Sequence, residues 1–208
     1  MSKTISYAIT VCNELEEIQK LLNFLQVRIR EEDEIVIQYD DQSVTDEVME
    51  YLTLMEKMHK YTIVGFPLNK DFGSFKNNLK QNCTKDYIFQ IDADEIPHEV
   101  MVEYLPQLLQ SNQVDVIFVP RVNTVEGLTD EHIQKWKWKV NEQGWVNWPD
   151  YQLRIYKRTD DVEWRNKVHE TITGYNTFSN FPAQEEWSLY HPKQIDRQEK
   201  QNQFYETI

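Results

Sequence analysis

The sequence predicts an α/β fold with a mainly parallel central sheet flanked by helices. Along residues 5–120, short apolar runs alternate with segments of helical periodicity, as in successive βαβ units. Polar clusters follow three of the apolar runs, and in a parallel sheet such clusters meet beyond the carboxyl ends of the strands. With 208 residues, 40% of them hydrophobic, the chain is long enough for one domain with its own core.

The first half of the chain supplies most of the sheet and its helices. Residues 5–11 read as a strand, and the helix after it has one apolar face made by Leu15, Ile18, Leu22 and Leu25. Asn13 and Glu16 are spaced as a capping box at the start of that helix. The later elements are strands at 35–39, 61–66, 87–91 and 114–120 and helices at 45–58, 74–82 and 99–110.

After residue 120 the alternation of strands and helices breaks. Residues 124–148 are rich in tryptophan, lysine and asparagine, and Trp136-Lys137-Trp138-Lys139 alternates like an exposed strand or lip. Short strands at 152–157 and 162–164 follow, and a polar helix at 195–207 ends the chain. We therefore expect a single domain over residues 1–208, with a first half (1–120), a smaller β-rich region (121–195) and a C-terminal helix (196–208).

The composition excludes several classes of protein. A net charge of −13 disfavours sequence-independent nucleic-acid binding, which requires a basic surface. No run approaches the ~20 apolar residues of a membrane-spanning helix, and the first residues are too short and polar a stretch for a signal peptide. Cys12 and Cys83 form neither a disulfide framework nor a zinc motif. We expect a cytoplasmic protein with no nucleic-acid partner and no membrane span.

Three acids follow the strand predicted at residues 87–91. Asp92 and Asp94 are two residues apart, so in extended backbone they project from the same side. Two like charges held that close are unfavourable unless a cation bridges them. The pattern predicts a divalent metal site, or alternatively a turn whose acids, Glu95 included, face water.

Two further polar sites belong to the same edge of the sheet. Asp40 and Asp41 follow the second strand, where carboxylates can accept hydrogen bonds from a ribose or from a base N–H. The alternative is that Asp41 or Ser43 caps the next helix. Lys76 and Lys80 are spaced i, i+4 on one helix face, which suits either a diphosphate or a solvated surface.

A fourth candidate site comes late in the chain, at His169 and Glu170. A lone histidine is usually structural, but His169 follows a short strand and is a candidate third ligand for a metal held by Asp94. A mixed carboxylate and imidazole set suits Mn²⁺, with Mg²⁺ as the alternative.

The tryptophans of residues 136–148 have two interpretations. Their indole faces can form a rim that stacks on a sugar or another ring, which makes Trp136, Trp138 and Trp148 candidate acceptor-binding residues. Alternatively, the same residues pack one face of a surface β-excursion.

The motifs, taken in order, resemble a known family. Ala-Ile-Thr-Val-Cys-Asn-Glu, Tyr-Asp-Asp-Gln-Ser-Val-Thr-Asp, Phe-Gly-Ser-Phe-Lys-Asn-Asn-Leu and Phe-Gln-Ile-Asp-Ala-Asp-Glu resemble the family 2 glycosyltransferases of GT-A fold. The later Trp-Pro-Asp-Tyr-Gln-Leu-Arg-Ile-Tyr-Lys-Arg and Val-His-Glu resemble a bacterial and viral branch of that family, which includes enzymes of lipopolysaccharide-core and capsule assembly. The resemblance runs from about residue 5 to about residue 191.

The resemblance implies roles for particular residues. On the nucleotide side, Asp41 or Asp40 would contact the base or ribose, and Thr10 and Glu14 would line the same pocket. Lys76 would lie near the diphosphate. The expected metal set is Asp94 as the direct ligand, Asp92 facing the ribose or a metal-bound water, and His169 completing the shell.

The family's catalytic base has no clear copy in this sequence. The usual Glu-Asp pair is absent, and Asp150 is the first choice for the base because it lies after the acceptor region and before a strand. Glu170 is the second choice. The usual Gln-x-x-Arg-Trp is also absent, with Gln152-Leu153-Arg154 a partial match, which argues against a processive polysaccharide synthase.

The resemblance implies a metal-dependent glycosyltransferase. It would transfer a sugar from a nucleotide diphosphate, expected to be a UDP-sugar, to an acceptor hydroxyl on a glycan, with inversion. One alternative is a non-catalytic nucleotide- or sugar-binding module of the same fold. Another is a sugar-nucleotide pyrophosphorylase, which should carry a Gly-rich, Arg-containing loop where this chain has Thr-Val-Cys-Asn-Glu-Leu.

Overall fold

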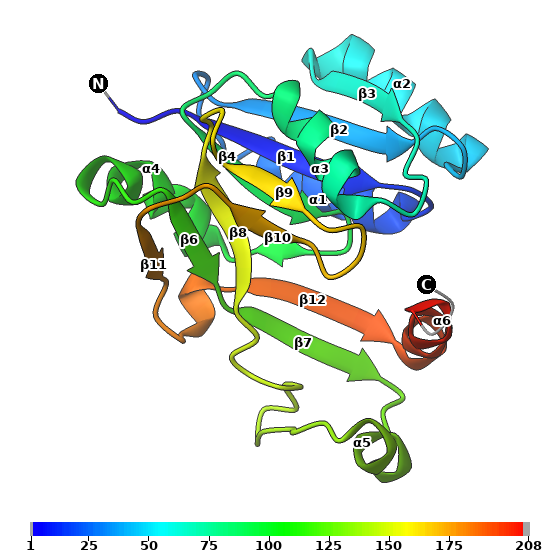
Figure 1. The fold of residues 1–208 in the computed structure, drawn as a ribbon. Helices are drawn as coiled ribbons and strands as arrows, with labels where there is room; N and C mark the ends of the chain where they lie inside the picture. The colour runs from blue at the N-terminus through cyan, green and yellow to red at the C-terminus, as the bar shows by residue number, and fades with distance from the viewer. Residues whose placement is uncertain (1, 206–208) are drawn as a thin grey trace.

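A seven-stranded sheet forms the centre of the molecule, with strand order β11-β6-β8-β4-β1-β2-β3 (Figure 1). The computed structural model describes residues 2–205. Neighbouring strands are parallel across β3, β2, β1 and β4, whereas β8 runs antiparallel to both β4 and β6. The mainly parallel sheet predicted from the sequence is confirmed. Its strands are β1 (Ile5–Val11), β2 (Glu34–Asp40), β3 (Thr62–Phe66), β4 (Tyr87–Asp92), β6 (Val116–Val119), β8 (Gln152–Lys157) and β11 (Phe178–Asn180).

Helices and a hairpin cover the two faces of this sheet. One face packs against α1 (Leu15–Leu25), α2 (Asp46–His59) and α4 (Glu99–Ser111), and the other against α3 (Phe72–Gln81) and the hairpin of β9 (Glu163–Arg165) and β10 (Thr171–Thr173). Tyr7 and Ile9 pack on the first face and Ala8 on the second. Burial on both sides explains why the strands read as continuous apolar runs. Across residues 2–205, no helix combines the length and apolar character needed to cross a bilayer.

A smaller three-stranded sheet combines two strands from the middle of the chain with one from near its end. Its order is β5-β12-β7, from β5 (Ile96–Pro97), β7 (Arg121–Glu126) and β12 (Leu189–Gln194). β12 runs parallel to β7, with His191 opposite Asn123. Figure 1 shows α6 (Ile195–Tyr205) at the carboxyl end of β12, near the end of β7. Residues far apart in sequence, from β4, β7, β12 and α6, are thereby brought to one edge. The remaining short elements are α5 (Asp130–Trp136) and the 3-10 helix η1 (Glu185–Trp187).

Two local predictions are wrong. No side chain caps α1, which starts at Leu15; instead, the Glu14 carboxylate accepts from the backbone N–H groups of Cys12 at 2.7 Å and Asn13 at 3.0 Å. The Trp136–Lys139 segment is not a strand either, because Trp136 ends α5 and Lys137 turns the chain with φ of 56°. Thr129 caps α5 in a capping box with His132, which stabilises a short helix.

The C-terminal helix predicted at 195–207 is present as α6 over Ile195–Tyr205, and its last two predicted residues lie outside the described part of the chain. The predicted division of the domain at residue 120 remains a prediction. Strands β8 and β11 come from beyond that point and complete the main sheet.

Candidate active site

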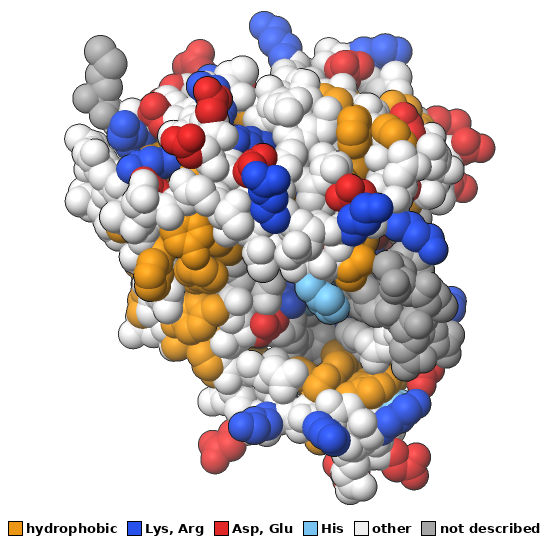
Figure 2. Space-filling view, in the orientation of Figure 1, with side chains coloured by type: hydrophobic (Ala, Val, Ile, Leu, Met, Phe, Trp, Pro, Cys, Tyr) orange, Lys and Arg blue, Asp and Glu red, His pale blue; other side chains and the backbone are white. Residues whose placement is uncertain are grey.

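The carboxyl ends of β1, β2 and β4 open onto a cavity of about 930 Å³, within the ~300–1,000 Å³ typical of ligand sites. Figure 2 shows this face of the molecule hollowed between its upper and lower parts. The expected site residues that line the cavity are Thr10, Glu14, Asp40, Lys76, Asp92, Asp94, Trp138, Asp150, His169 and Glu170. Asp41, Trp136 and Trp148 are not among its lining residues.

Asp92 ends β4 and is held by partners from two neighbouring strands. The parallel register sets Thr10 beside it. The Thr10 hydroxyl donates to Oδ1 at 2.8 Å, and Arg154 Nη2 of β8 donates to Oδ2 at 2.7 Å. Burial alone would raise the pKa of Asp92, but the positive charges of Arg154 and Lys76 and these hydrogen bonds together hold it well below its usual range. Asp92 is therefore a fixed carboxylate at neutral pH.

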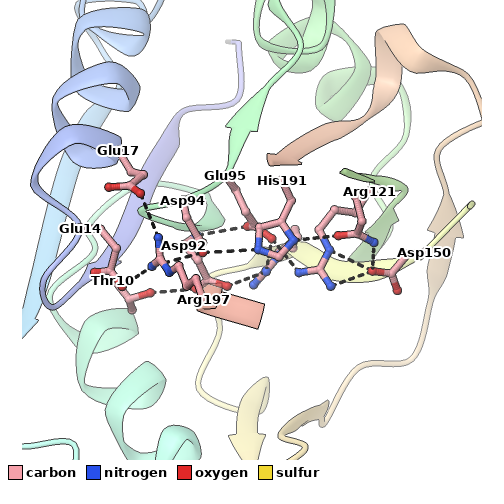
Figure 3. A network of polar contacts seen from close by, with 12 residues as sticks. Thr10, Glu14, Glu17, Asp92, Asp94, Glu95, Arg121, Asp150, His191 and Arg197 are labelled. Atoms are coloured by element: carbon pink, nitrogen blue, oxygen red, sulfur yellow. Dashed lines mark hydrogen bonds and ion pairs between the residues drawn. The ribbon is translucent and has the colours of Figure 1, made fainter. Parts of the chain in front are cut away.

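Glu95 lies at the centre of a buried ion-pair network (Figure 3). Its side chain has no exposed surface, and its Oε1 lies 2.5 Å from Arg154 Nη2 and 3.1 Å from Arg121 Nη1. The other oxygen, Oε2, accepts from the Asp92 backbone N–H at 3.2 Å. The expectation of a turn whose acids face water is therefore wrong for Glu95. Burial at this depth requires the two guanidinium groups, because an unpaired buried charge is strongly unfavourable.

Asp150 lines the cavity and is oriented by three side chains. Arg121 donates to Oδ2 from Nε at 2.9 Å and from Nη2 at 2.7 Å, and Asn123 donates to the same oxygen at 2.8 Å. Gln152 donates to Oδ1 at 2.8 Å. Burial favours a raised pKa, but Arg121 and these hydrogen bonds outweigh it, so the pKa of Asp150 is lowered. The side chain remains 26% exposed.

Asp94 faces a histidine that the sequence analysis missed. His191 Nε2 of β12 lies 3.4 Å from Asp94 Oδ2, and its Nδ1 lies 2.7 Å from the Asn123 carbonyl oxygen Oδ1. Because that oxygen only accepts hydrogen bonds, Nδ1 carries a hydrogen. In a neutral imidazole, Nε2 then turns a lone pair toward the Asp94 carboxylate. A divalent ion could lie between these two groups, and the Arg197 guanidinium, whose Nη2 is 3.6 Å from Asp94 Oδ2, also places positive charge beside the carboxylate.

The neighbours of Asp94 lower its pKa. Burial raises it, but the hydrogen bond and charge of His191, with help from Lys193, lower it overall, although Asp92 opposes the shift. The only sequence signal for His191 is a histidine in the strand-like run Leu189-Tyr190-His191, and no spacing relates it to Asp94.

A divalent ion fits the Asp94 and His191 pair, with a carboxylate oxygen and an imidazole nitrogen as ligands. Among residues 2–205, no three His, Cys, Asp or Glu side chains are grouped closely enough to hold an ion. The expected set of Asp92, Asp94 and His169 is thus not assembled as a metal site. Mg²⁺ is usually bound through one or two carboxylates, with substrate phosphates and water completing its shell.

Lys76 and Glu170, two expected site residues, pair with each other. Lys76 lies on α3 and is buried, with Nζ 2.5 Å from Glu170 Oε1 and 4.5 Å from the centre of the Trp164 ring. A solvated surface lysine, the alternative considered for this position, is excluded. The ion pair also occupies the Glu170 carboxylate, which lies between β9 and β10.

On the nucleotide side, Asp40 and Asp41 differ in their surroundings. Asp40 is buried, and its Oδ1 accepts from the Leu68 backbone N–H at 3.0 Å. This hydrogen bond holds the loop after β3 against the end of β2. Asp41 is exposed in the turn beside it. Of the two candidates, the cavity therefore presents Asp40.

The tryptophans of residues 136–148 form two pairs. Trp138 lines the cavity, and Trp136 packs against it with ring centres 4.6 Å apart. Trp136 in turn stacks on His132 at 5.0 Å. Trp148 packs with Trp145 at 4.8 Å. One indole thus faces the cavity while the other rings support each other.

The fold and the position of the cavity are those of α/β proteins that bind their ligands beyond the carboxyl ends of parallel strands. The chain belongs to glycosyl transferase family 2, whose family model matches residues 6–187. Comparison with curated proteins finds no match.

Solved structures support the same fold. The structure of S. aureus TarS 1-349 in complex with UDP aligns with a TM-score of 0.63 at 13% identity, covering 91% of this chain and 60% of that chain. The complex of the same protein with UDP-GlcNAc aligns with a TM-score of 0.61 at 15% identity, covering 93% and 59%. The chain thus spans about 60% of the length of these TarS chains. The GT-A glycosyltransferase fold expected from the sequence is confirmed.

Proposed function

We propose that the chain is a glycosyltransferase that moves a sugar from a UDP-sugar to a hydroxyl group of an acceptor glycan, with inversion and with a divalent ion, Mn²⁺ or Mg²⁺. Family membership supports the reaction class. The choice of UDP is supported by the TarS complexes, which contain UDP and UDP-GlcNAc. The two free thiols, Cys12 and Cys83, are consistent with action in the cytoplasm, where thiols stay reduced.

The facing pair of Asp94 and His191 is the observation that carries the proposal. It presents one oxygen and one nitrogen ligand 3.4 Å apart on the wall of the cavity. A divalent ion bound there supplies positive charge that stabilises a departing diphosphate. Asp40, Thr10 and Glu14 line the same cavity toward β1 and β2, and we assign the base and ribose of the nucleotide to that end.

Asp150 is the base that we assign to the acceptor hydroxyl. Its Oδ2 accepts three hydrogen bonds from Arg121 and Asn123, whereas Oδ1 accepts one, from Gln152. We therefore assign the acceptor's proton to Oδ1. The acceptor oxygen forms a bond to the anomeric carbon as the bond to the nucleotide diphosphate breaks, and attack opposite the leaving group inverts that carbon. Glu170 is the weaker candidate because its carboxylate is paired with Lys76.

Substitutions at Asp94 and Asp150 separate the two halves of this mechanism. Asp94→Asn should abolish both sugar transfer and nucleotide-sugar hydrolysis, whereas Asp150→Asn should bind UDP as the wild type does and lose transfer by at least about 100-fold, as general-base catalysis typically contributes. UDP release from a panel of nucleotide sugars, with circular dichroism as the folding control, measures both. Transfer and hydrolysis near wild-type rates in Asp94→Asn, with the ion supplied, would contradict the proposal.

A binding module without turnover is the second candidate. The hydrogen bonds that lower the pKa of Asp150 also weaken it as a base, and this observation favours the module. Calorimetry with UDP and Mn²⁺, followed by the hydrolysis panel, distinguishes the two. Tight UDP binding with no turnover of any nucleotide sugar would establish the module and exclude the enzyme.

A further inference from the structure

Arg197 reaches from the C-terminal helix α6 into the cavity and meets three carboxylates (Figure 3). Its Nη1 lies 2.9 Å from Glu17 Oε1, and its Nη2 lies 2.8 Å from Glu14 Oε1. The same Nη2 is 3.6 Å from Asp94 Oδ2. One guanidinium therefore links the start of α1, where Glu14 and Glu17 lie, to the proposed metal ligand.

These contacts make Arg197 a competitor of a metal ion. A divalent ion on Asp94 would place two further positive charges within a few ångströms of the guanidinium, and cations at such distances repel each other. Ion binding thus favours the departure of Arg197 from Asp94. Glu14 and Glu17 hold the Arg197 side chain in place as long as no anion that binds a guanidinium more strongly is present.

A diphosphate is such an anion. Guanidinium groups bind phosphate oxygens through two parallel hydrogen bonds, and these charge-assisted bonds are stronger than neutral ones. A diphosphate that shares the ion with Asp94 would lie beside that residue, within reach of a side chain that already approaches Asp94 Oδ2. The side chain of Arg197 is 36% exposed, so packing does not lock it in its present position.

We propose that Arg197 is a ligand of the donor diphosphate and exchanges partners on binding. In the ligand-free chain it pairs with Glu14, Glu17 and Asp94. When the ion and the nucleotide diphosphate bind together, it transfers to the diphosphate. This inference deepens the proposed function and rests on it, since the diphosphate is that of the UDP-sugar.

The exchange predicts opposite effects on two ligands. Arg197→Gln removes the competing cation, so Mn²⁺ alone should bind more tightly, by roughly 3- to 10-fold. The same variant loses the diphosphate contact, so UDP in saturating Mn²⁺ should bind about 10- to 100-fold more weakly. If Arg197 had a purely structural role, its substitution would weaken the binding of both Mn²⁺ and UDP. Arg197→Lys keeps the charge without the planar fork, so it should leave the Mn²⁺ affinity near wild type and weaken UDP binding.

Isothermal titration with Mn²⁺ alone and with UDP in saturating Mn²⁺ measures both effects. Arg28→Gln is the matched control. Arg28 forms an ion pair with Glu99 at 3.2 Å and does not line the cavity, so this substitution should leave both affinities unchanged. The proposal is overturned if Arg197→Gln binds UDP within 2-fold of wild type, or if its Mn²⁺ and UDP affinities fall together. Absence of Mn²⁺-dependent UDP binding in the wild type would instead overturn the proposed function, and this inference with it.

Discussion

Among single residues of the site, Glu95 is a fully buried carboxylate that depends on two ion pairs. Its carboxylate has no exposed surface and lies between Arg154 and Arg121. Breaking a buried ion pair leaves uncompensated charge in the interior. We expect Glu95→Gln to lower the free energy of unfolding by about 3–5 kcal/mol, measured by chemical denaturation.

Glu99→Gln is the control for this substitution. Glu99 also pairs with an arginine, Arg28, but its side chain is 63% exposed, and exposed pairs contribute at most about 1 kcal/mol. Equal losses of stability in the two variants would contradict the assignment of Glu95 to a buried network.

Asp92 gives the same network a pH dependence. Burial opposes ionisation of Asp92, but Arg154, Lys76 and hydrogen bonds hold its pKa well below the usual range. A carboxylate whose pKa is lower in the folded chain stabilises the fold fully above its unfolded pKa of about 3.9, and that contribution is lost as the pH falls toward the folded pKa. We therefore expect Asp92→Asn to be less stable than wild type at pH 7, with a deficit that shrinks below about pH 4.

Denaturation curves at pH values from 7 down to 2 measure this difference. A deficit that stays constant over the whole range would mean that the ionised form of Asp92 gains nothing from Arg154.

At the scale of elements, the β9–β10 hairpin depends on Gly174, which follows β10 with φ of +82°. A Cβ there would come within 1.7 Å of the Asp161 carbonyl oxygen. We expect Gly174→Ala to lower the free energy of unfolding by the ~1–2 kcal/mol of left-handed backbone and by a further ~1–3 kcal/mol for the clash. Thermal unfolding measures the sum.

Gly144 separates the two effects, because its φ is +80° and a Cβ there would meet nothing within 4 Å. Gly144→Ala should show the backbone cost alone. If the two variants are equally stable, Gly174 does not lie as close to the Asp161 carbonyl as the structure places it. Since Glu170 lies between β9 and β10 and pairs with Lys76, loss of the hairpin should also loosen that side of the cavity.

The elements differ in how well the sequence predicts them. The strands β1, β2 and β4 and the helices α1, α2 and α4 were predictable because burial gives them long apolar runs or clear helical periodicity. α5 was not. Its 7 residues are too few for a periodic pattern, and the tryptophan-lysine alternation at its end imitates a strand. What stabilises it is the local capping by Thr129 and His132.

At the scale of the whole molecule, topology explains which parts of the site were predictable. Thr10, Asp40 and Asp92 lie at the carboxyl ends of parallel strands, and these ends meet at one edge in any fold of this class. Arg154 and His191 depend on strand order instead. Arg154 reaches Asp92 because β8 lies antiparallel beside β4. His191 reaches Asp94 because β12 pairs with β5, which begins two residues after Asp94. Neither arrangement leaves a pattern in local sequence.

In the mechanism that we propose, Asp94 and His191 hold the ion on which nucleotide binding depends. Measuring the affinity for UDP with and without Mn²⁺ in wild type, His191→Gln and His169→Gln tests it most directly. Both histidines line the cavity, but His191 is the one that faces Asp94 at 3.4 Å. We expect His191→Gln to lose the Mn²⁺ enhancement of UDP binding and His169→Gln to keep it. The reverse, loss of the enhancement in His169→Gln with full enhancement in His191→Gln, would contradict it.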